Sequence, residues 1–432
     1  MKTSISLFRF EAVLVAFMAL IVSGCSKNKD NGSPAFSQDY VVFAWNDLGM
    51  HCLNPTYDKA VILPPYNNLM AQVVLRGNPP QIVTTGIKVE YRIMGNTSSY
   101  GKRGYGGFWD NITPLFGLAS LQHDVGLTGN RLSGTMQAAS GHFEATGIPV
   151  TPVNDLDVWD PLQVAEVTVT DGSGKTLATT RATVPTSDDI NCAKCHGNDA
   201  FNDVLQKHDS EEGTNLMQAK PVLCAKCHGS PALGQTGRGT AGTYLSEAIH
   251  GFHADKGASC YDCHPGNITK CNRSEKHTAA DGNCTRCHGS ADQVASSTRA
   301  GRIPWVNEPT CSSCHAGVTD AGSSASLYRN STGHGNLMCT SCHGSPHAMV
   351  PSLKDADNYQ AMQYQPYSKS PKTLGSCGTC HHSSRGESEI GDYAEVHGGS
   401  NPEKENGCFI CHTSVQANTA KWPHAFTWQD SN

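Results

Sequence analysis

The feature that most constrains this chain is one pentapeptide, Cys-x-x-Cys-His, which occurs eight times between residues 192 and 412. His makes up 20 of the 432 residues, so chance would place it after a given Cys only about once in twenty, yet all eight pairs have it. A zinc ribbon or a dithiol redox site also uses Cys-x-x-Cys, but neither needs a His in the next position. The eight copies, each given as first Cys, second Cys and His, are Cys192, Cys195 and His196; Cys224, Cys227 and His228; Cys260, Cys263 and His264; Cys284, Cys287 and His288; Cys311, Cys314 and His315; Cys339, Cys342 and His343; Cys377, Cys380 and His381; and Cys408, Cys411 and His412.

This pentapeptide is the attachment signal for c-type haem. The two thiols add across the two vinyl groups of haem, and the two residues between them set the separation of the sulfurs. The His that follows directly is then placed beneath the iron as the proximal ligand. The sequence therefore predicts eight covalent c-type haems, attached through the sixteen motif Cys residues. The expected proximal ligands are His196, His228, His264, His288, His315, His343, His381 and His412.

Each iron also needs a group opposite its proximal His, and the same region holds nine further His residues. Since there are nine candidate His residues for eight irons, we expect mainly bis-His coordination and low reduction potentials. His382 directly follows a proximal His, so it must serve a neighbouring haem; which His serves which haem stays open. Met217, Met338, Met349 and Met362 are alternative ligands that would raise a potential. The distal candidates are His208, His250, His253, His277, His334, His347, His382, His397 and His424.

The first 25 residues have the pattern of an export signal. Lys2 and Arg9 precede an apolar run over 12–22 that is too short to span a bilayer. The run ends in Val-Ser-Gly-Cys, which resembles a bacterial lipobox with Cys25 as the lipid-modified residue. An ordinary signal peptide with a stray Cys and an uncleaved anchor are the alternatives. Residues 26–38 are small and polar, as in a tether between a lipid and a fold.

Residues 39–186 hold no haem motif and are expected to form a β-sandwich-like domain. The expected strands are 40–45, 71–75, 87–93, 164–170 and 176–184, and the last two flank the turn sequence Asp171-Gly172-Ser173-Gly174 and predict a hairpin. Residues 95–147 show no clear period. The segment Trp45-Asn46-Asp47-Leu48-Gly49-Met50-His51-Cys52 stands apart: His51 is a further, weaker candidate for an axial ligand, or a structural His in a turn. Cys52 and Cys271 lie outside the motifs, and in an oxidising compartment they would be able to form a disulfide.

Residues 187–432 are expected to form a loop-rich octahaem domain in which the haems replace an aliphatic core. Successive motifs begin 24 to 38 residues apart, too irregularly for a solenoid. The intervening sequence is rich in Gly, Ser, Asn and Pro, so each motif is expected on a short helical turn. The formal net charge of -6, with no basic stripe, argues against nucleic acid as a partner.

With its signal, lipobox and haem region, the chain resembles the outer-surface multihaem c-type cytochromes of metal-reducing bacteria. The resemblance implies an outer-membrane lipoprotein facing the cell exterior, with stacked haems that carry electrons to metal oxides, electrodes or partner cells. It implies an electron carrier rather than an enzyme. Octahaem reductases and oxidases of small nitrogen or sulfur compounds are the first alternative; they keep one open iron, often at a Cys-x-x-Cys-Lys motif, which none of the eight motifs here has. A polymeric cytochrome filament is the second alternative.

Overall fold

The computed structural model describes residues 39–77, 79–266, 268–278, 284–314, 327–365, 372–375 and 377–381. The export signal, Cys25 and the tether lie outside these residues. So do the site residues His315, His382, His397 and His424 and the eighth motif, which consists of Cys408, Cys411 and His412. Residues Gln38–Asn432 belong to one unit, which contains both predicted domains. None of the described helices is both long and apolar enough to span a membrane.

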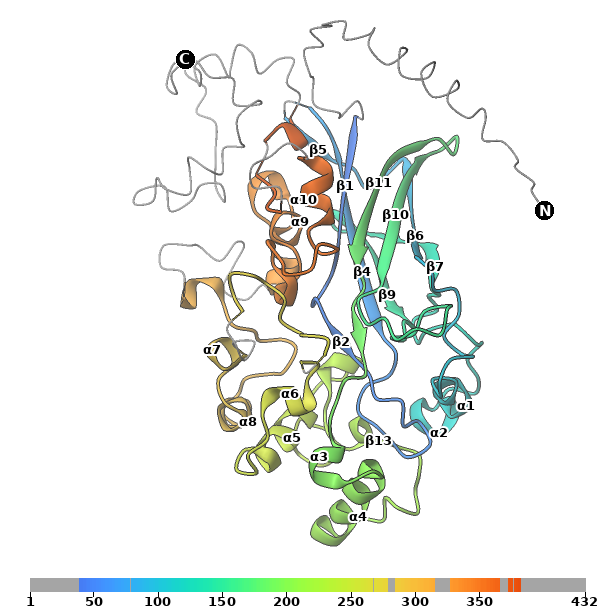
Figure 1. Cartoon of the computed structure of the whole chain (residues 1–432), viewed down its shortest axis with the longest axis vertical. Helices are drawn as coiled ribbons and strands as arrows, with labels where there is room; N and C mark the ends of the chain where they lie inside the picture. The colour runs from blue at the N-terminus through green and yellow to red at the C-terminus, as the bar shows by residue number, and fades with distance from the viewer. Residues whose placement is uncertain are drawn as a thin grey trace, which may run out of the picture. The chain divides into compact units, whose positions relative to one another are not determined.

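Residues 39–186 form two antiparallel sheets over a shared apolar core (Figure 1). The first sheet has the strand order β1-β4-β9-β8, with β5 also paired to β4, and the second has the order β11-β10-β6-β7. The strands of the first sheet are β1 (Tyr40–Asn46), β4 (Asn67–Leu75), β5 (Gln81–Ile82), β8 (Gln137–Ala139) and β9 (His142–Ile148). Those of the second are β6 (Ile87–Ile93), β7 (Ser133–Thr135), β10 (Val164–Asp171) and β11 (Thr176–Thr183).

Alternation of apolar and polar residues explains why these strands face one core. In β10, Ala165, Val167 and Val169 are fully buried, whereas Glu166 and Thr168 between them are partly exposed. The buried face of β10 joins a cluster that includes Val42, Leu69, Ala71 and Phe143 of the first sheet and Val89, Tyr91 and Ile93 of the second. Removal of this apolar area from water is the main force holding the sheets together.

The predicted hairpin is confirmed. Strands β10 and β11 pair in antiparallel register, and the Asp171 carboxylate accepts the backbone N–H groups of Ser173 and Lys175 at 2.9 and 3.0 Å in the turn between them. The other three predicted strands are also present, and β4 begins four residues before the predicted position. Strands β7, β8 and β9, which fall mainly in the segment without a clear period, were not predicted.

A second apolar cluster lies beside the sheets and extends into the motif region. It packs Phe108 and Leu115 of helices α1 (Gly107–Asp110) and α2 (Ile112–Phe116) against Tyr57, and includes Leu223 and Ala225 of the second motif segment. Two short parallel pairings connect the halves of the chain: β3 (Ala60–Val61) with β13 (Val222–Leu223), and β2 (His51–Cys52) with β12 (Thr186–Ser187).

From residue 193 onward, the described chain consists of short helices, 3-10 turns and loops. The helices are α3 (Ala193–His196), α4 (Ala200–Glu212), α5 (Leu245–His253), α6 (Cys260–Cys263), α7 (Cys284–His288), α8 (Ala291–Arg299), α9 (Cys339–His343) and α10 (Tyr359–Tyr364). The 3-10 turns are Cys224–Lys226, Pro231–Leu233, Cys311–Ser313, Tyr328–Asn330, His334–Asn336, Pro346–Ala348 and Cys377–Thr379. Each described motif thus begins or spans a helical turn, as the sequence predicted.

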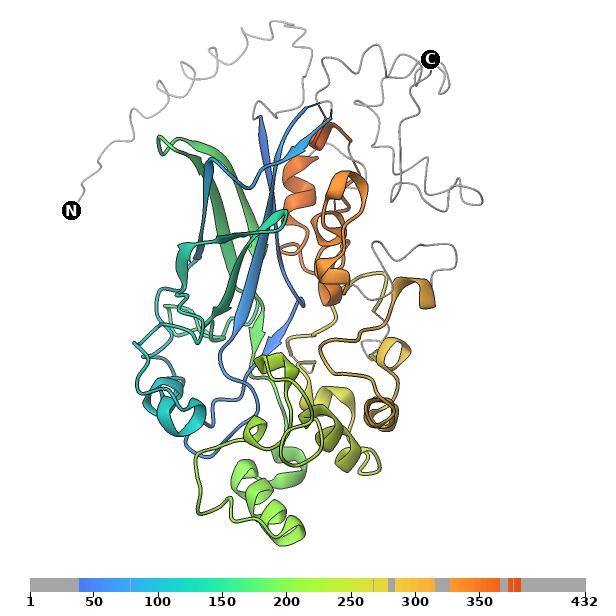
Figure 2. The ribbon, with the colours of Figure 1, turned by 180° about the vertical axis from the view of Figure 1, so that it is seen from behind.

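These helices follow one side of the sheets, as both views of the ribbon show (Figures 1 and 2). The second motif segment pairs with β3 at one end of the sheet domain. Farther along, Gln72 of β4 accepts the backbone N–H of Met338 at 3.0 Å, and Arg76 donates to the Gly378 carbonyl at 2.8 Å beside the seventh motif. The sheet domain therefore contacts the motif region along its length.

Candidate functional site

The described motifs project their thiols and imidazole from one helical turn. The backbone N–H of the His bonds the carbonyl of the first Cys in three motifs, at 3.0 Å for His196, 3.1 Å for His228 and 2.8 Å for His264. Residues three and four apart on a helical turn share a face, so both Cys side chains and the His side chain are available to one flat group. For Cys377 and His334 the structure describes the backbone alone.

The two thiols of one motif differ in how far the protein covers them. The first Cys of a motif is partly buried in five motifs, namely at Cys192, Cys224, Cys260, Cys284 and Cys339. The second Cys is exposed in five motifs, namely at Cys195, Cys227, Cys263, Cys287 and Cys314. In the first four motifs, the first thiol is therefore more covered by the protein than the second.

Covalent attachment at the motif thiols stays a prediction, and the exposure of the second thiol is compatible with it. No disulfide joins the Cys residues whose side chains the structure describes. An exposed sulfur is accessible to a large reactant, as addition to a vinyl group requires. Thioether formation at Cys195, Cys227, Cys287 and Cys314 therefore stays a prediction, and Cys411 of the eighth motif lies outside the described residues.

Four of the proximal His residues each lie opposite a His from outside the motifs. The distances between ring centres are 6.3 Å for His196–His253, 6.3 Å for His208–His228, 6.0 Å for His250–His264 and 6.1 Å for His288–His347. Each pair joins one predicted proximal ligand to one predicted distal candidate. For these four motifs, the structure therefore shows which distal candidate lies opposite which predicted proximal His.

The spacing of these rings is that of two ligands on opposite sides of one metal ion. An imidazole nitrogen lies about 2 Å from a metal that it binds and about 1 Å from its own ring centre, so two such rings have centres about 6 Å apart. Direct contact between aromatic rings also allows this separation. The angles between the ring planes, however, range from 17° to 78°. The pairs therefore have a common distance between ring centres but no common orientation of the rings.

Hydrogen bonds at Nδ1 leave Nε2 for a metal in four of these eight imidazoles. His250, His253 and His347 each place Nδ1 at 2.7 to 2.9 Å from a backbone carbonyl, and His196 places it 2.6 Å from the Asp203 carboxylate. These acceptors have no proton to give, so Nδ1 carries the proton and Nε2 keeps its lone pair. A carbonyl or carboxylate at the other ring nitrogen is the usual support of a metal-bound His.

The environment also keeps these rings uncharged. Burial, reinforced by neighbouring imidazoles, lowers the pKa of His264 and of His347 to about 4. Burial likewise lowers the pKa of His228, His250 and His288. A metal ligand must be the neutral imidazole, so these five rings are already in the binding form at neutral pH.

The buried motif thiols do not resemble a dithiol redox centre. Burial raises the pKa of Cys224, Cys339 and Cys342 to about 11 and that of Cys380 to about 12. A reactive dithiol requires a thiolate and therefore a lowered pKa. These four thiols are held protonated, which argues against the dithiol interpretation.

Single elements connect consecutive His pairs. Helix α4 carries Asp203, which contacts His196 of the first motif, and His208, which faces the second motif. Helix α5 carries His253, which faces the first motif, and His250, which faces the third. The first and third motifs also meet directly, because Lys194 forms an ion pair with Asp262 at 2.8 Å.

The connection continues to the fourth and sixth motifs. A Cβ placed on Gly251 of α5 would lie 3.5 Å from Ala295 of α8, so α5 packs on the helix that follows the fourth motif. His347, opposite His288 of the fourth motif, lies four residues after His343 of the sixth. The motifs thus follow one another in space in the order second, first, third, fourth, sixth, which differs from their order in the chain.

The remaining candidates have other surroundings. Nδ1 of His277 lies 3.1 Å from the Ser274 hydroxyl. His51 is 7% exposed, and its Nε2 lies 2.6 Å from the Asp47 carboxylate, so this nitrogen already has a protein partner. Cys52 and Cys271 are free thiols in the structure, and burial raises the pKa of Cys271 to about 12. The disulfide between them stays a prediction.

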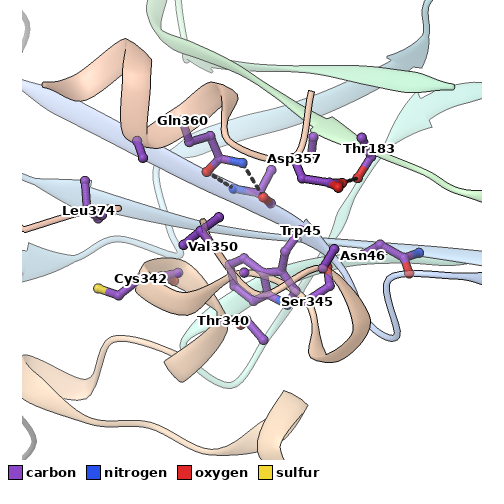
Figure 3. A pocket seen from close by; sticks show the side chains of 16 residues that line it. Trp45, Asn46, Thr183, Thr340, Cys342, Ser345, Val350, Asp357, Gln360 and Leu374 are labelled. Carbon is purple, nitrogen blue, oxygen red and sulfur yellow. Dashed lines mark hydrogen bonds between the residues drawn. The ribbon is translucent and has the colours of Figure 1, made fainter. Parts of the chain in front are cut away.

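A cavity of about 40 Å³ lies between the first sheet and the sixth motif (Figure 3). Trp45 and Asn46 of β1, Thr340 and Cys342 of α9, and Gln360 of α10 line it. It is far smaller than the several hundred Å³ of a typical small-molecule site. A more open hollow of about 380 Å³ lies beside Trp159 and Ile268. None of the eight paired His residues lines either of these two spaces.

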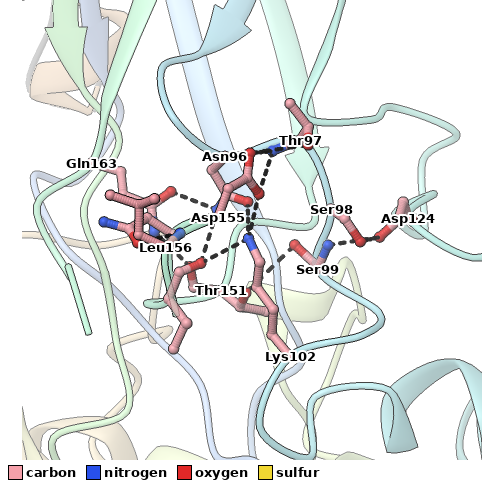
Figure 4. Close-up of polar contacts among 12 residues, drawn as sticks. Asn96, Thr97, Ser98, Ser99, Lys102, Asp124, Thr151, Asp155, Leu156 and Gln163 are labelled. Atoms are coloured by element: carbon pink, nitrogen blue, oxygen red, sulfur yellow. Dashed lines mark hydrogen bonds and ion pairs between the residues drawn. The ribbon is translucent and has the colours of Figure 1, made fainter. Parts of the chain in front are cut away.

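A separate polar cluster in the sheet domain is structural (Figure 4). The Lys102 ammonium donates to Asn96 at 2.6 Å and to Asp155 at 2.9 Å, and Asn96 donates to Gln163 at 2.6 Å. These groups satisfy one another and connect the loops that follow β6 and precede β10. None of the paired His residues takes part in this cluster.

Comparison with known proteins returned no match. No family model matches the chain, and neither a curated protein nor a solved structure does. Among the described residues, no three His, Cys, Asp or Glu side chains gather in a group that would hold a bare metal ion. The four His pairs offer two nitrogen ligands each.

Proposed function

We propose that this protein is an exported octahaem c-type cytochrome that transfers electrons along a row of covalently bound haems. The observation that supports it best is the set of four pairs in which a motif His faces a non-motif His at 6.0 to 6.3 Å. These residues would fit haem, because each His pair would hold the iron of one haem through two imidazole nitrogens. When bound, haem supplies a reversible one-electron change at iron.

The residues of the chain prepare the sites for this role. Carbonyls and the Asp203 carboxylate fix the ring orientation, and burial keeps the rings neutral. A site with two fixed axial imidazoles leaves no position for a substrate and changes little in geometry with charge. Because α4 and α5 each contact two motifs, neighbouring sites are also held close together. These properties favour a relay.

The enzyme alternative requires an iron with one open position. For the first, second, third and fourth motifs, a His from outside the motifs lies opposite the motif His, so each site would offer an imidazole on both sides of an iron. We therefore propose electron transfer ahead of reduction or oxidation of small nitrogen or sulfur compounds. The filament alternative requires a ligand from a second copy, and these four motifs have theirs within the chain.

We also propose the surroundings in which the relay works. The lipobox at Cys25 would anchor the protein to the outer membrane, facing outward, with redox proteins or extracellular acceptors as partners. The formal charge of -6 is that of the chain without haem and favours neither nucleic acid nor an anionic surface. The two sheets, which we propose as a sandwich-like domain, would serve as the scaffold for the haems.

The intact mass of the mature protein, made with a haem-maturation system, tests the cofactor. We expect the mass of the chain plus eight haems, retained under denaturing conditions. Replacing Cys260 and Cys263 by Ser removes both thioether bonds of one motif and is expected to remove one haem. Replacing Cys52 and Cys271 by Ser is the matched control, since neither lies in a motif, and should remove none. A protein purified without covalent haem would refute the proposal.

A further inference from the structure

The segment Asn46–His51 is the one sequence feature in the sheet domain that the proposed function does not use. It leaves the end of β1 and lies buried against the motif region: Asn46, Asp47 and His51 are 1%, 2% and 7% exposed. Asn46 accepts the backbone N–H groups of Leu48 and Gly49 at 3.1 and 2.7 Å. The segment, which we call the 46–51 loop, is therefore internally fixed.

Neighbouring strands and the motif region hold the 46–51 loop from both sides. The Asp47 carboxylate lies 2.6 Å from Nε2 of His51 and accepts from the Asn68 amide at 2.7 Å. On the opposite side, the buried Arg273 guanidinium donates to the Gly49 carbonyl at 2.7 Å. The loop has little freedom to move relative to either half of the protein.

The 46–51 loop contacts one member of a His pair directly. The Leu48 carbonyl accepts two hydrogen bonds from His347, one from the backbone N–H at 3.1 Å and one from the ring Nδ1 at 2.9 Å. The second bond fixes the protonated nitrogen of His347 and leaves Nε2 with its lone pair. The ring centre of His288 lies 6.1 Å from that of His347. No other paired His in the described structure takes its Nδ1 acceptor from the sheet domain.

Gly49 makes this close approach possible. Its φ of +84° lies in the left-handed region, which L side chains rarely adopt. A Cβ at this position would lie 3.1 Å from the backbone nitrogen of Ala348 and 3.2 Å from that of His347. Backbone atoms cannot yield as a flexible side chain does, so a side chain here would push the loop away from His347.

We propose that the 46–51 loop is a positioning element for His347 and thereby sets the axial coordination and redox behaviour of the haem at the fourth motif alone. The inference rests on the proposed function, since it assumes a haem between His288 and His347. It gives the sheet domain a second role: besides scaffolding the motif region, it tunes one site in the middle of the row.

The test compares two glycine variants of the full haem-loaded protein. Gly49→Ala is expected to displace the Leu48 carbonyl and to change the electron paramagnetic resonance signal and the midpoint potential of one haem of the eight. Gly86→Ala is the matched control: Gly86 has a similar φ of +74°, but a Cβ there meets nothing within 4 Å. The control carries the same backbone strain and should leave every haem signal unchanged.

His347→Ala identifies the haem concerned, because it removes the distal ligand itself. The double variant Gly49→Ala with His347→Ala should show the spectrum of His347→Ala alone, since the loop acts only through that ring. If Gly49→Ala does not fold, Asn46→Ala loosens the same loop without a steric clash and should shift the same signal. Wild-type haem signals in a folded, haem-loaded Gly49→Ala or Asn46→Ala variant would overturn the inference. Wild-type protein without haem would instead refute the proposed function.

Discussion

At the residue scale, the hydrogen bond at Nδ1 of an imidazole decides whether Nε2 is available to a metal. A His that faces another His is common in protein interiors, and distance alone does not distinguish a ligand pair from a ring contact. The backbone carbonyls at Nδ1 of His250, His253 and His347 make the difference, because they leave Nε2 as the acceptor. The number of these His residues could be read from the sequence, but the orientation of their rings could not. That orientation depends on acceptors from the previous helical turn or from another domain.

Removing one distal imidazole should open one iron. His250→Ala is expected to convert one haem from low spin to high spin and to make it bind carbon monoxide, as an absorbance difference spectrum of the reduced protein would show. His123→Ala is the control, because His123 lies outside the motif region and stacks on Tyr100 at 3.4 Å. An unchanged spectrum for His250→Ala would mean that His250 is no ligand.

Asp155 should make stability depend on pH. Although partial burial opposes ionisation, hydrogen bonds from Thr97 and the nearby Lys102 ammonium hold the pKa of Asp155 below its usual value. A lowered pKa in the folded state stabilises the protein above the unfolded value of about 3.9, and this contribution disappears as the pH falls through the folded value. Asp155→Asn should therefore cost up to about 1 kcal/mol at neutral pH. Urea unfolding should show this difference shrinking below about pH 4; a difference that grew there would contradict the assignment.

At the element scale, prediction succeeded where a pattern is local. The alternation in β10 and β11 and the turn at Asp171–Gly174 were sufficient to predict that hairpin. The Gly-, Ser-, Asn- and Pro-rich sequence between the motifs predicted the short turn at each described motif. The two-residue parallel pairs β2–β12 and β3–β13 join segments more than a hundred residues apart, so no local pattern marks them. Gly251 lies where α5 packs on α8, a contact that no local pattern marks either.

Helix α5 should couple two sites, since His250 faces the third motif and His253 the first. Ile249→Pro places a helix breaker directly before His250 and four residues before His253, at a cost of about 3 kcal/mol or more to the helix. We expect two haems to change their paramagnetic resonance signals together, whereas His250→Ala changes one. Ser296→Pro breaks α8, which carries no paired His, and should change fewer. Loss of a single signal in Ile249→Pro would show that the two ligands are independent.

At the scale of the whole molecule, a buried ion pair joins the sheet domain to the motif region. Arg273 is 1% exposed and donates to both oxygens of Asp357 at 2.9 and 3.0 Å. Asp357 also accepts from Thr183 of β11 at 2.6 Å, and Arg273 reaches the Gly49 carbonyl. One network therefore ties both sheets' edges to the segments around the fourth and sixth motifs.

Breaking this pair from one side should destabilise the protein strongly. Arg273→Met leaves the Asp357 carboxylate buried without its counter-charge, so we expect a loss of about 3 to 5 kcal/mol in the free energy of unfolding. The control is Arg92→Met, whose partner Glu166 accepts at the surface at 2.6 Å and whose loss should cost no more than about 1 kcal/mol. Chemical denaturation of both variants checks the contrast. Equal losses would mean that the buried pair contributes no more than a surface one.

The order of the sites is the property of the whole molecule that the sequence could not give. Chain order runs from the first motif to the eighth, but the shared helices place the second motif before the first, and His347 carries the row from the fourth to the sixth. This order depends on contacts between segments up to about seventy residues apart, such as His288 with His347 and Lys194 with Asp262. Such contacts could not be predicted from the periodicity of the sequence or from the spacing of the motifs.

The most direct test of the central claim is the spin state of the irons. We would record the electron paramagnetic resonance spectrum of the oxidised haem-loaded protein and add carbon monoxide to the reduced form. The account predicts low-spin signals only and no response to carbon monoxide, because it assigns each iron an imidazole on both sides. A high-spin haem that binds carbon monoxide in the wild-type protein would contradict it and would favour a reductase or oxidase of small nitrogen or sulfur compounds.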